Sequence, residues 1–133
     1  KASAFIFTAA LPPASVAGGL EGLDILANDS KRRKRLHENT TFIKRAFFEL
    51  GIQVNNNHVP IVPIQIGDEA LTLYMNRLLF DDAVFAGVAV SPVVPPLKAM
   101  IRTSYTSEHT KKDLDRILTS FEKNLKKIGI LPQ

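Results

Sequence analysis

Apolar residues recur at steps of three and four residues along four segments of this chain, which is the spacing of one face of a helix. The most regular segment covers residues 111–128, where Thr110 is suited to cap the first turn and Gly129 to end the last one. The other three predicted helices cover residues 13–27, 30–50 and 69–81.

Three further segments are short, apolar and rich in β-branched residues, and they predict strands over residues 61–66, 84–90 and 100–106. Pro63 lacks an N–H, so it belongs on an edge strand or at a bulge. A short proline-rich loop at residues 91–96 joins the last two strands. These two strands are therefore predicted to be antiparallel neighbours, because a parallel crossover needs a much longer connection.

The expected order is an arm with a short strand at residues 3–8, two helices, a strand, a helix, two strands and a final helix. This order predicts an α+β fold of two layers, with a small, mostly antiparallel three-stranded sheet covered by helices. Three glycines in the first helix indicate either close approach to another backbone or a helix that merely tolerates them: Gly18, Gly19 and Gly22.

Composition narrows the possible functions. The 133 residues carry a net charge of +4 and are 45% hydrophobic, which excludes a disordered chain. The absence of cysteine excludes disulfides and thiolate chemistry and fits a reducing compartment. The longest apolar runs fall short of the ~20 residues that cross a bilayer. The chain opens without Met or a signal-peptide layout, so we interpret it as a fragment of a longer protein.

Five consecutive cations at residues 31–35 are the strongest charge feature. Such a run can bind nucleic acid, but no aromatic residues alternate with it, as they do in single-strand binders. We therefore interpret it as a solvated helix face. The three histidines share no metal-ligand spacing, and His109, at a strand-to-helix junction, is expected to hydrogen-bond backbone rather than to catalyse.

Arg102 is a stronger candidate for a functional residue, because it alternates with apolar residues on a predicted strand. A guanidinium is costly to desolvate unless it meets an anion, and it binds a carboxylate through two parallel hydrogen bonds. A substrate carboxylate is one natural partner. The alternatives are an Asp or Glu of the same fold, or simple exposure to solvent.

Six motifs occur in a fixed order, namely Phe-Ile-Phe-Thr-Ala-Ala-Leu-Pro-Pro at 5–13, Arg-Leu-His-Glu-Asn-Thr at 35–40, Pro-Ile-Val-Pro-Ile-Gln-Ile-Gly-Asp at 60–68, Ser-Pro-Val-Val-Pro at 91–95, Met-Ile-Arg-Thr-Ser at 100–104 with Glu-His-Thr at 108–110, and Asp-Leu-Asp-Arg at 113–116. Together they resemble the α-oxoamine synthases, which are pyridoxal-phosphate enzymes of fold type I. The resemblance covers essentially the whole chain.

The resemblance implies an aminotransferase-like C-terminal domain. Residues 1–28 would form an arm and a connecting helix that lead from a large domain, and residues 29–133 would form the small domain. The lysine that binds pyridoxal 5'-phosphate in this family lies upstream of the first motif. The chain is therefore expected to hold no catalytic residue and to be inactive alone. A metal site is not expected either, because the histidines lack metal-ligand spacing.

Two site residues follow from the resemblance. Arg102 matches the arginine that holds the amino-acid carboxylate. Thr8 matches a hydroxyl that reaches the cofactor phosphate of the neighbouring subunit, although Ala9 replaces the second hydroxyl of many members. The loop at residues 91–96 would border the active-site entrance, and the stretch at 87–89 departs from the commoner family patterns.

The family implies a cytoplasmic, homodimeric acyltransferase that condenses an amino acid with an acyl-CoA and releases carbon dioxide. An enzyme like 8-amino-7-oxononanoate synthase, which acts in biotin biosynthesis, is the first expectation. Serine palmitoyltransferase and 2-amino-3-ketobutyrate CoA ligase are the alternatives within the family. A non-catalytic α+β binding module that uses residues 31–35 is the alternative from another class. Neither membrane insertion nor specific nucleic-acid binding is expected.

Overall fold

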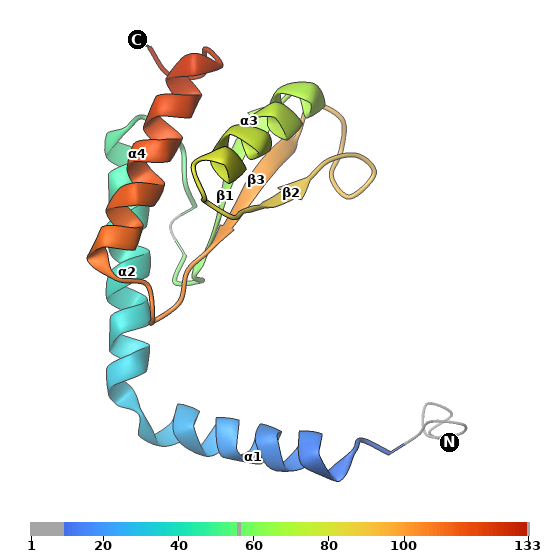
Figure 1. Cartoon of the computed structure of the whole chain (residues 1–133), viewed down its shortest axis with the longest axis vertical. Helices are drawn as coiled ribbons and strands as arrows, with labels where there is room; N and C mark the ends of the chain where they lie inside the picture. Colours follow the sequence, from blue (N-terminus) through green and yellow to red (C-terminus); the bar gives the residue numbers. More distant parts are fainter. Residues whose placement is uncertain (1–9, 56, 133) are drawn as a thin grey trace. The chain divides into compact units, whose positions relative to one another are not determined.

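The computed structural model describes residues 10–55 and 57–132 (Figure 1). The predicted short strand at residues 3–8 lies outside these ranges. The order of helices and strands from residue 10 onward is as expected from the sequence. The elements are α1 (Pro13–Asn28), α2 (Ser30–Glu49), β1 (Ile61–Gly67), α3 (Glu69–Asp81), β2 (Gly87–Ala89), β3 (Ala99–Ser104) and α4 (Lys111–Lys127).

The chain divides into two compact units, Lys1–Arg33 and Lys34–Gln133. In the first unit, α1 starts at a proline, as its fixed φ favours, and contains no buried residue. A Cβ placed on Gly18, Gly19 or Gly22 would meet nothing within 4 Å in the described structure, so close backbone approach is not observed there. The expected domain boundary after residue 28 stays a prediction.

Glycines end two helices in the second unit, as their sequence positions predict. Gly51 follows α2 with φ +84°, and Gly129 follows α4 with φ +77°. In each case the next N–H reaches back to close the helix: Ile52 donates to the Phe47 carbonyl and Ile130 to the Leu125 carbonyl. Because this left-handed conformation suits glycine, these two positions determine where α2 and α4 stop.

The three strands form one antiparallel sheet in the order β1-β3-β2. The prediction that the last two strands pair is confirmed, and Pro63 lies on the edge strand β1. Strand β2 is shorter than the predicted 84–90. The reason is local: the Val84 N–H bonds to the Leu79 carbonyl and completes the end of α3, so the chain reaches β3 only at Gly87.

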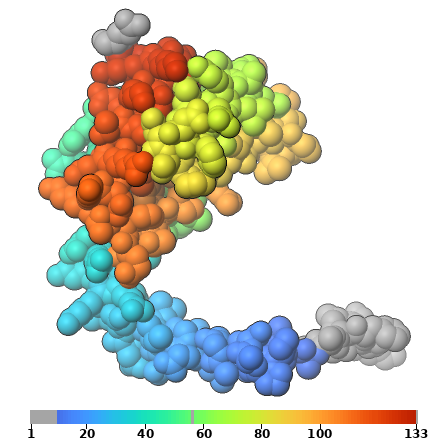
Figure 2. Space-filling model, viewed as in Figure 1, coloured from blue at the N-terminus to red at the C-terminus, as the bar shows by residue number. Residues whose placement is uncertain are grey.

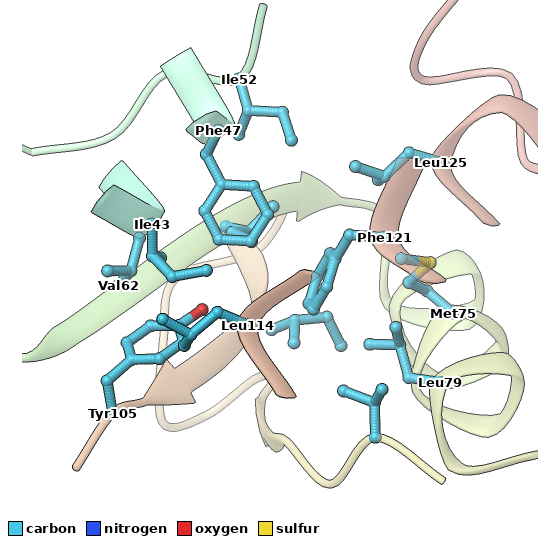
Figure 3. Packing of buried hydrophobic residues seen from close by; sticks show 13 residues of the cluster. Ile43, Phe47, Ile52, Val62, Met75, Leu79, Tyr105, Leu114, Phe121 and Leu125 are labelled. Carbon is cyan, nitrogen blue, oxygen red and sulfur yellow. The ribbon is translucent and has the colours of Figure 1, made fainter. Parts of the chain in front are cut away.

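Helices pack on one face of this sheet, which confirms the two-layer α+β fold. At the centre of the core, the rings of Phe47 from α2 and Phe121 from α4 meet edge to face, with centroids 5.2 Å apart (Figure 3). Met75 and Leu79 of α3 close the core beside Phe121. Figure 2 shows α3 and α4 adjoining on the surface of this unit.

The end of α3 is joined to α4 by the side chain of Asp82. Its carboxylate accepts hydrogen bonds from Ser120 Oγ and Asn124 Nδ2, each at 2.8 Å, and from Lys123 Nζ at 2.9 Å. The bond from Lys123, followed by those from Ser120 and Asn124, lowers the pKa of Asp82 to about 2. The charged carboxylate therefore stabilises the contact between these two helices.

Because of this carboxylate, we expect the free energy of unfolding to fall at acidic pH. Because its folded pKa lies below its ordinary value, the stabilisation is present above about pH 4 and is lost as the pH falls toward 2. Urea unfolding at a series of pH values should show Asp82→Asn with a shallower loss of stability across this window than the wild type. Asp81→Asn, which removes only a pair with Arg77 on the same helix, is the control. Equal pH profiles for Asp82→Asn and the wild type would contradict the role.

Candidate functional site

The face of the sheet opposite the helices carries Arg102. Burial alternates along β3, so that Ile101 and Thr103 face the core while Arg102 is exposed on the other side. Its cross-strand neighbours are Pro63 on β1 and Gly87 on β2. Of the strand residues described on this open face, Arg102 is the charged one.

Arg102 has no protein partner in the described ranges. No carboxylate of the described residues lies within 4.0 Å of its guanidinium, and none of their side-chain hydrogen bonds involves it, although six other Lys and Arg side chains form ion pairs. The alternative of an ion pair within the same fold is thus not observed in the part of the chain that the structure describes. A guanidinium that is exposed and unpaired on a sheet face can bind an external carboxylate through two hydrogen bonds.

The loop at residues 91–96 connects β2 to β3 at one end of this face. It is tied to α3 by a hydrogen bond from the Ser91 N–H to Glu69 Oε1 at 3.2 Å. Val93 is exposed near its tip, and Leu97, just after it, is exposed with φ +61°. The loop therefore presents apolar side chains to solvent beside the sheet that carries Arg102.

Thr8, the candidate contact of the pyridoxal phosphate, lies outside the described residues. On the open face, the described strands contain no lysine that could form an imine with an aldehyde, and a single arginine suits a carboxylate rather than a whole cofactor. The described strands therefore do not form a pyridoxal-phosphate site by themselves.

A hollow of about 230 Å³ at the end of β3 contains His109, Asp113 and Arg116. These three side chains each have a structural partner, whereas the hydroxyl of Tyr105, which also lines the hollow, is buried with no hydrogen-bond partner among the described residues. His109 Nδ1 accepts a hydrogen bond from the Thr106 N–H, Asp113 completes the capping box with Thr110, and Arg116 donates to a backbone carbonyl. Hydrogen bonds to Thr110 lower the pKa of Asp113. His109 thus bonds backbone, as its position in the sequence predicts.

The basic run at residues 31–35 lies in the first turns of α2, and all five side chains are exposed. Arg32 Nε lies 3.3 Å from Asp29 Oδ2, and Lys34 Nζ lies 3.9 Å from Glu38 Oε1. Asp29 also caps α2 by accepting a hydrogen bond from the Arg32 N–H. Local pairing of this kind fits a solvated helix face.

The described residues were also searched for metal-binding clusters and for membrane-spanning helices. No three His, Cys, Asp or Glu side chains among them lie close enough to hold a metal ion together. None of the helices in the described ranges is both long and apolar enough to cross a membrane.

The sequence singles out Arg102 as a candidate but not Gly87, which lies opposite it. The residues at 87–89 stood out only as a departure from a pattern, because a strand register cannot be read from the sequence. Pairing across β2 and β3 is what places Gly87 directly opposite Arg102.

Comparison with known proteins shows the family to which the chain belongs. Residues 1–121 match the aminotransferase class I and II family. The 8-amino-7-oxononanoate synthase of Thermoanaerobacter pseudethanolicus is 40% identical over 127 residues, which are 96% of this chain and 32% of that protein. The chain thus spans about a third of the length of such curated relatives.

Solved structures agree on the fold. The structure of Sphingomonas wittichii serine palmitoyltransferase covers 98% of this chain with a TM-score of 0.90 at 23% identity, using 33% of its own chain. The 8-amino-7-oxononanoate synthase of Francisella tularensis covers 92% of this chain with a TM-score of 0.78 at 27% identity, using 36% of its own chain. The matched third is the C-terminal part of these enzymes. This chain therefore belongs to the aminotransferase class I and II family, with the α-oxoamine synthases as its relatives.

Proposed function

We propose that the chain is part of a pyridoxal-phosphate-dependent α-oxoamine synthase, which joins an amino acid to an acyl-CoA, and that Arg102 binds the carboxylate of the amino acid. The observation that carries this proposal is the exposed guanidinium of Arg102, unpaired in the described structure, on the open face of the sheet. In the proposal the cofactor is held outside the described residues, with Thr8 as the one candidate contact from this chain.

Arg102 would act by binding and by orientation. Two parallel N–H···O bonds define the plane of a carboxylate as well as its position. Holding that plane also restricts rotation about the bond between the carboxylate and Cα, so the other substituents of Cα take defined directions. This use of binding to orient a reacting centre can lower a reaction barrier substantially.

The substrates that we propose first follow from the structure of 8-amino-7-oxononanoate, the product for which the relatives are named. An 8-amino-7-oxononanoate has nine carbons, with a methyl group next to the amine-bearing carbon. Alanine minus its carboxyl group contributes two carbons, and a seven-carbon dicarboxylic acyl group contributes the other seven. The new bond joins Cα to the acyl carbon, while coenzyme A leaves as the thiol and the carboxylate leaves as carbon dioxide.

The alternatives within the family use different pairs. A serine palmitoyltransferase takes serine and a palmitoyl group, and Val-Ser-Pro-Val-Val-Pro at residues 90–95 resembles that branch. A 2-amino-3-ketobutyrate CoA ligase joins glycine to an acetyl group, and its product keeps the carboxylate. The proposed enzyme is a homodimer, because Thr8 would reach the cofactor bound by the second subunit.

The full-length protein loaded with pyridoxal phosphate tests the proposal. Free coenzyme A and carbon dioxide should appear in equal amounts with alanine and pimeloyl-CoA. Turnover with serine and palmitoyl-CoA instead would identify the first alternative. Coenzyme A without carbon dioxide from glycine and acetyl-CoA would identify the second. Absence of turnover with every pair would contradict the proposal.

The 133-residue chain alone is the matched control for this assay. It should show no turnover and no absorbance of a lysine-bound pyridoxal phosphate, because the family lysine is expected upstream. Stoichiometric attachment of the cofactor at one lysine of this chain would contradict the assignment of the cofactor to residues outside it.

A further inference from the structure

Gly87 lies at the start of the edge strand β2, on the open face of the sheet. It begins β2 and pairs directly with Arg102 across the strands. Its φ lies outside the positive range in which glycine is favoured, unlike that of Gly51, Gly67 and Gly129. The φ at Gly87 therefore does not require glycine, and glycine in a strand is less stable than a residue with a side chain. We therefore looked to the side chains next to Gly87 on the open face for a role of glycine at this position.

The side chain of Arg102 lies above it. A Cβ built on Gly87 would be 3.6 Å from the backbone oxygen of Arg102, 3.7 Å from Arg102 Nε and 3.9 Å from Arg102 Cβ, all of them ordinary contact distances. The arginine thus leans across the strands toward Gly87, where a Cβ would just touch it and a larger side chain pointing the same way would meet it. Its other cross-strand neighbour is Pro63 on β1.

We propose that Gly87 is a positioning residue, whose missing side chain lets Arg102 lie across β2 and thereby sets where its guanidinium meets the substrate carboxylate. This inference rests on the proposed role of Arg102. It adds that the direction of the guanidinium depends on an empty space at position 87, and not on a charged partner.

The size and charge of a substitute determine the expected effect. Alanine adds one carbon at an ordinary contact distance from Nε, so the arginine can stay in place. Valine adds two more carbons about 1.5 Å beyond Cβ, which must displace the arginine side chain. Aspartate places a carboxylate beside the guanidinium, where it competes with the carboxylate of the substrate.

The test uses the full-length protein loaded with pyridoxal phosphate and measures amino-acid binding by calorimetry, together with KM and kcat. Gly87→Ala should bind the amino acid within about threefold of the wild type. Gly87→Val should bind it about tenfold to a hundredfold more weakly, the scale of a misplaced binding group. The KM for the acyl-CoA should stay unchanged in both variants.

A matched control comes from the same strand and face. Ala89→Val makes the same kind of change opposite Met100 instead of Arg102, and it should leave amino-acid binding unaltered. Gly87→Val introduced into an Arg102→Ala protein should add little further loss, because the group that it displaces is already absent. Thermal unfolding of each variant checks that the fold is intact.

Several outcomes would overturn the inference. Unchanged binding in both Gly87→Val and Gly87→Asp, with weakened binding in Arg102→Ala, would reject the role of Gly87 and leave the proposed function standing. An equal loss from Gly87→Val with and without Arg102 would show that Gly87 acts independently of the arginine. Unchanged binding in Arg102→Ala would reject the proposed role of Arg102 itself.

Discussion

Arg102→Ala in the full-length protein is expected to weaken amino-acid binding by about thirtyfold to a few thousandfold. Truncating one partner of a two-pronged charged hydrogen bond costs roughly 2–5 kcal/mol, and each ~1.4 kcal/mol is a factor of ten. Arg102→Lys should recover only part of the loss, because an ammonium keeps the charge but not the planar fork. Calorimetric titration with the amino acid measures both effects.

The stability of the fold separates this role from a structural one. Arg102 is exposed and has no ion pair in the described ranges, so its removal should change the free energy of unfolding by less than about 0.5 kcal/mol. Arg77→Ala, which removes an exposed pair with Asp81 on α3, is a control for loss of a surface cation. A large loss of stability with unchanged amino-acid binding would contradict the carboxylate role of Arg102.

Phe121→Ala is expected to destabilise the chain by about 3–5 kcal/mol, as for other large aromatic residues truncated in a core. Phe121 is fully buried and meets the ring of Phe47 edge to face at 5.2 Å. The loss combines the transfer of the ring from the core, the cavity left behind and this aromatic pair. It is a large share of the ~5–15 kcal/mol by which a typical domain is stable. Urea unfolding of the 133-residue chain measures the change.

Helix α2, which carries the partner ring of Phe47, supplies a control for this prediction. Phe48 follows Phe47 on α2 but is 71% exposed, whereas Phe47 is fully buried. Phe48→Ala should therefore change the free energy of unfolding by less than about 0.5 kcal/mol, and Phe47→Ala should resemble Phe121→Ala. Equal effects of Phe47→Ala and Phe48→Ala would contradict the packing described for α2.

Helices and their ends could be predicted from the sequence because the signals are local. The Thr110 cap and the glycines at 51 and 129 act on residues within one turn of themselves, and in α2 and α4 the apolar spacing selects the face that becomes buried. The pairing of the last two strands also follows from a short connection. The length of β2 was overestimated, because the end of α3 uses Val84 for a hydrogen bond of its own.

By itself, the sequence determined the fold class and indicated Arg102, because an arginine that alternates with apolar residues can be recognised from its near neighbours. Only the tertiary structure showed that Arg102 lies on the open face without a carboxylate partner in the described residues, and that Gly87 lies opposite it. Both facts depend on strand register and on which face the helices cover. Register and layer packing join residues far apart in the chain, so local spacing cannot determine them.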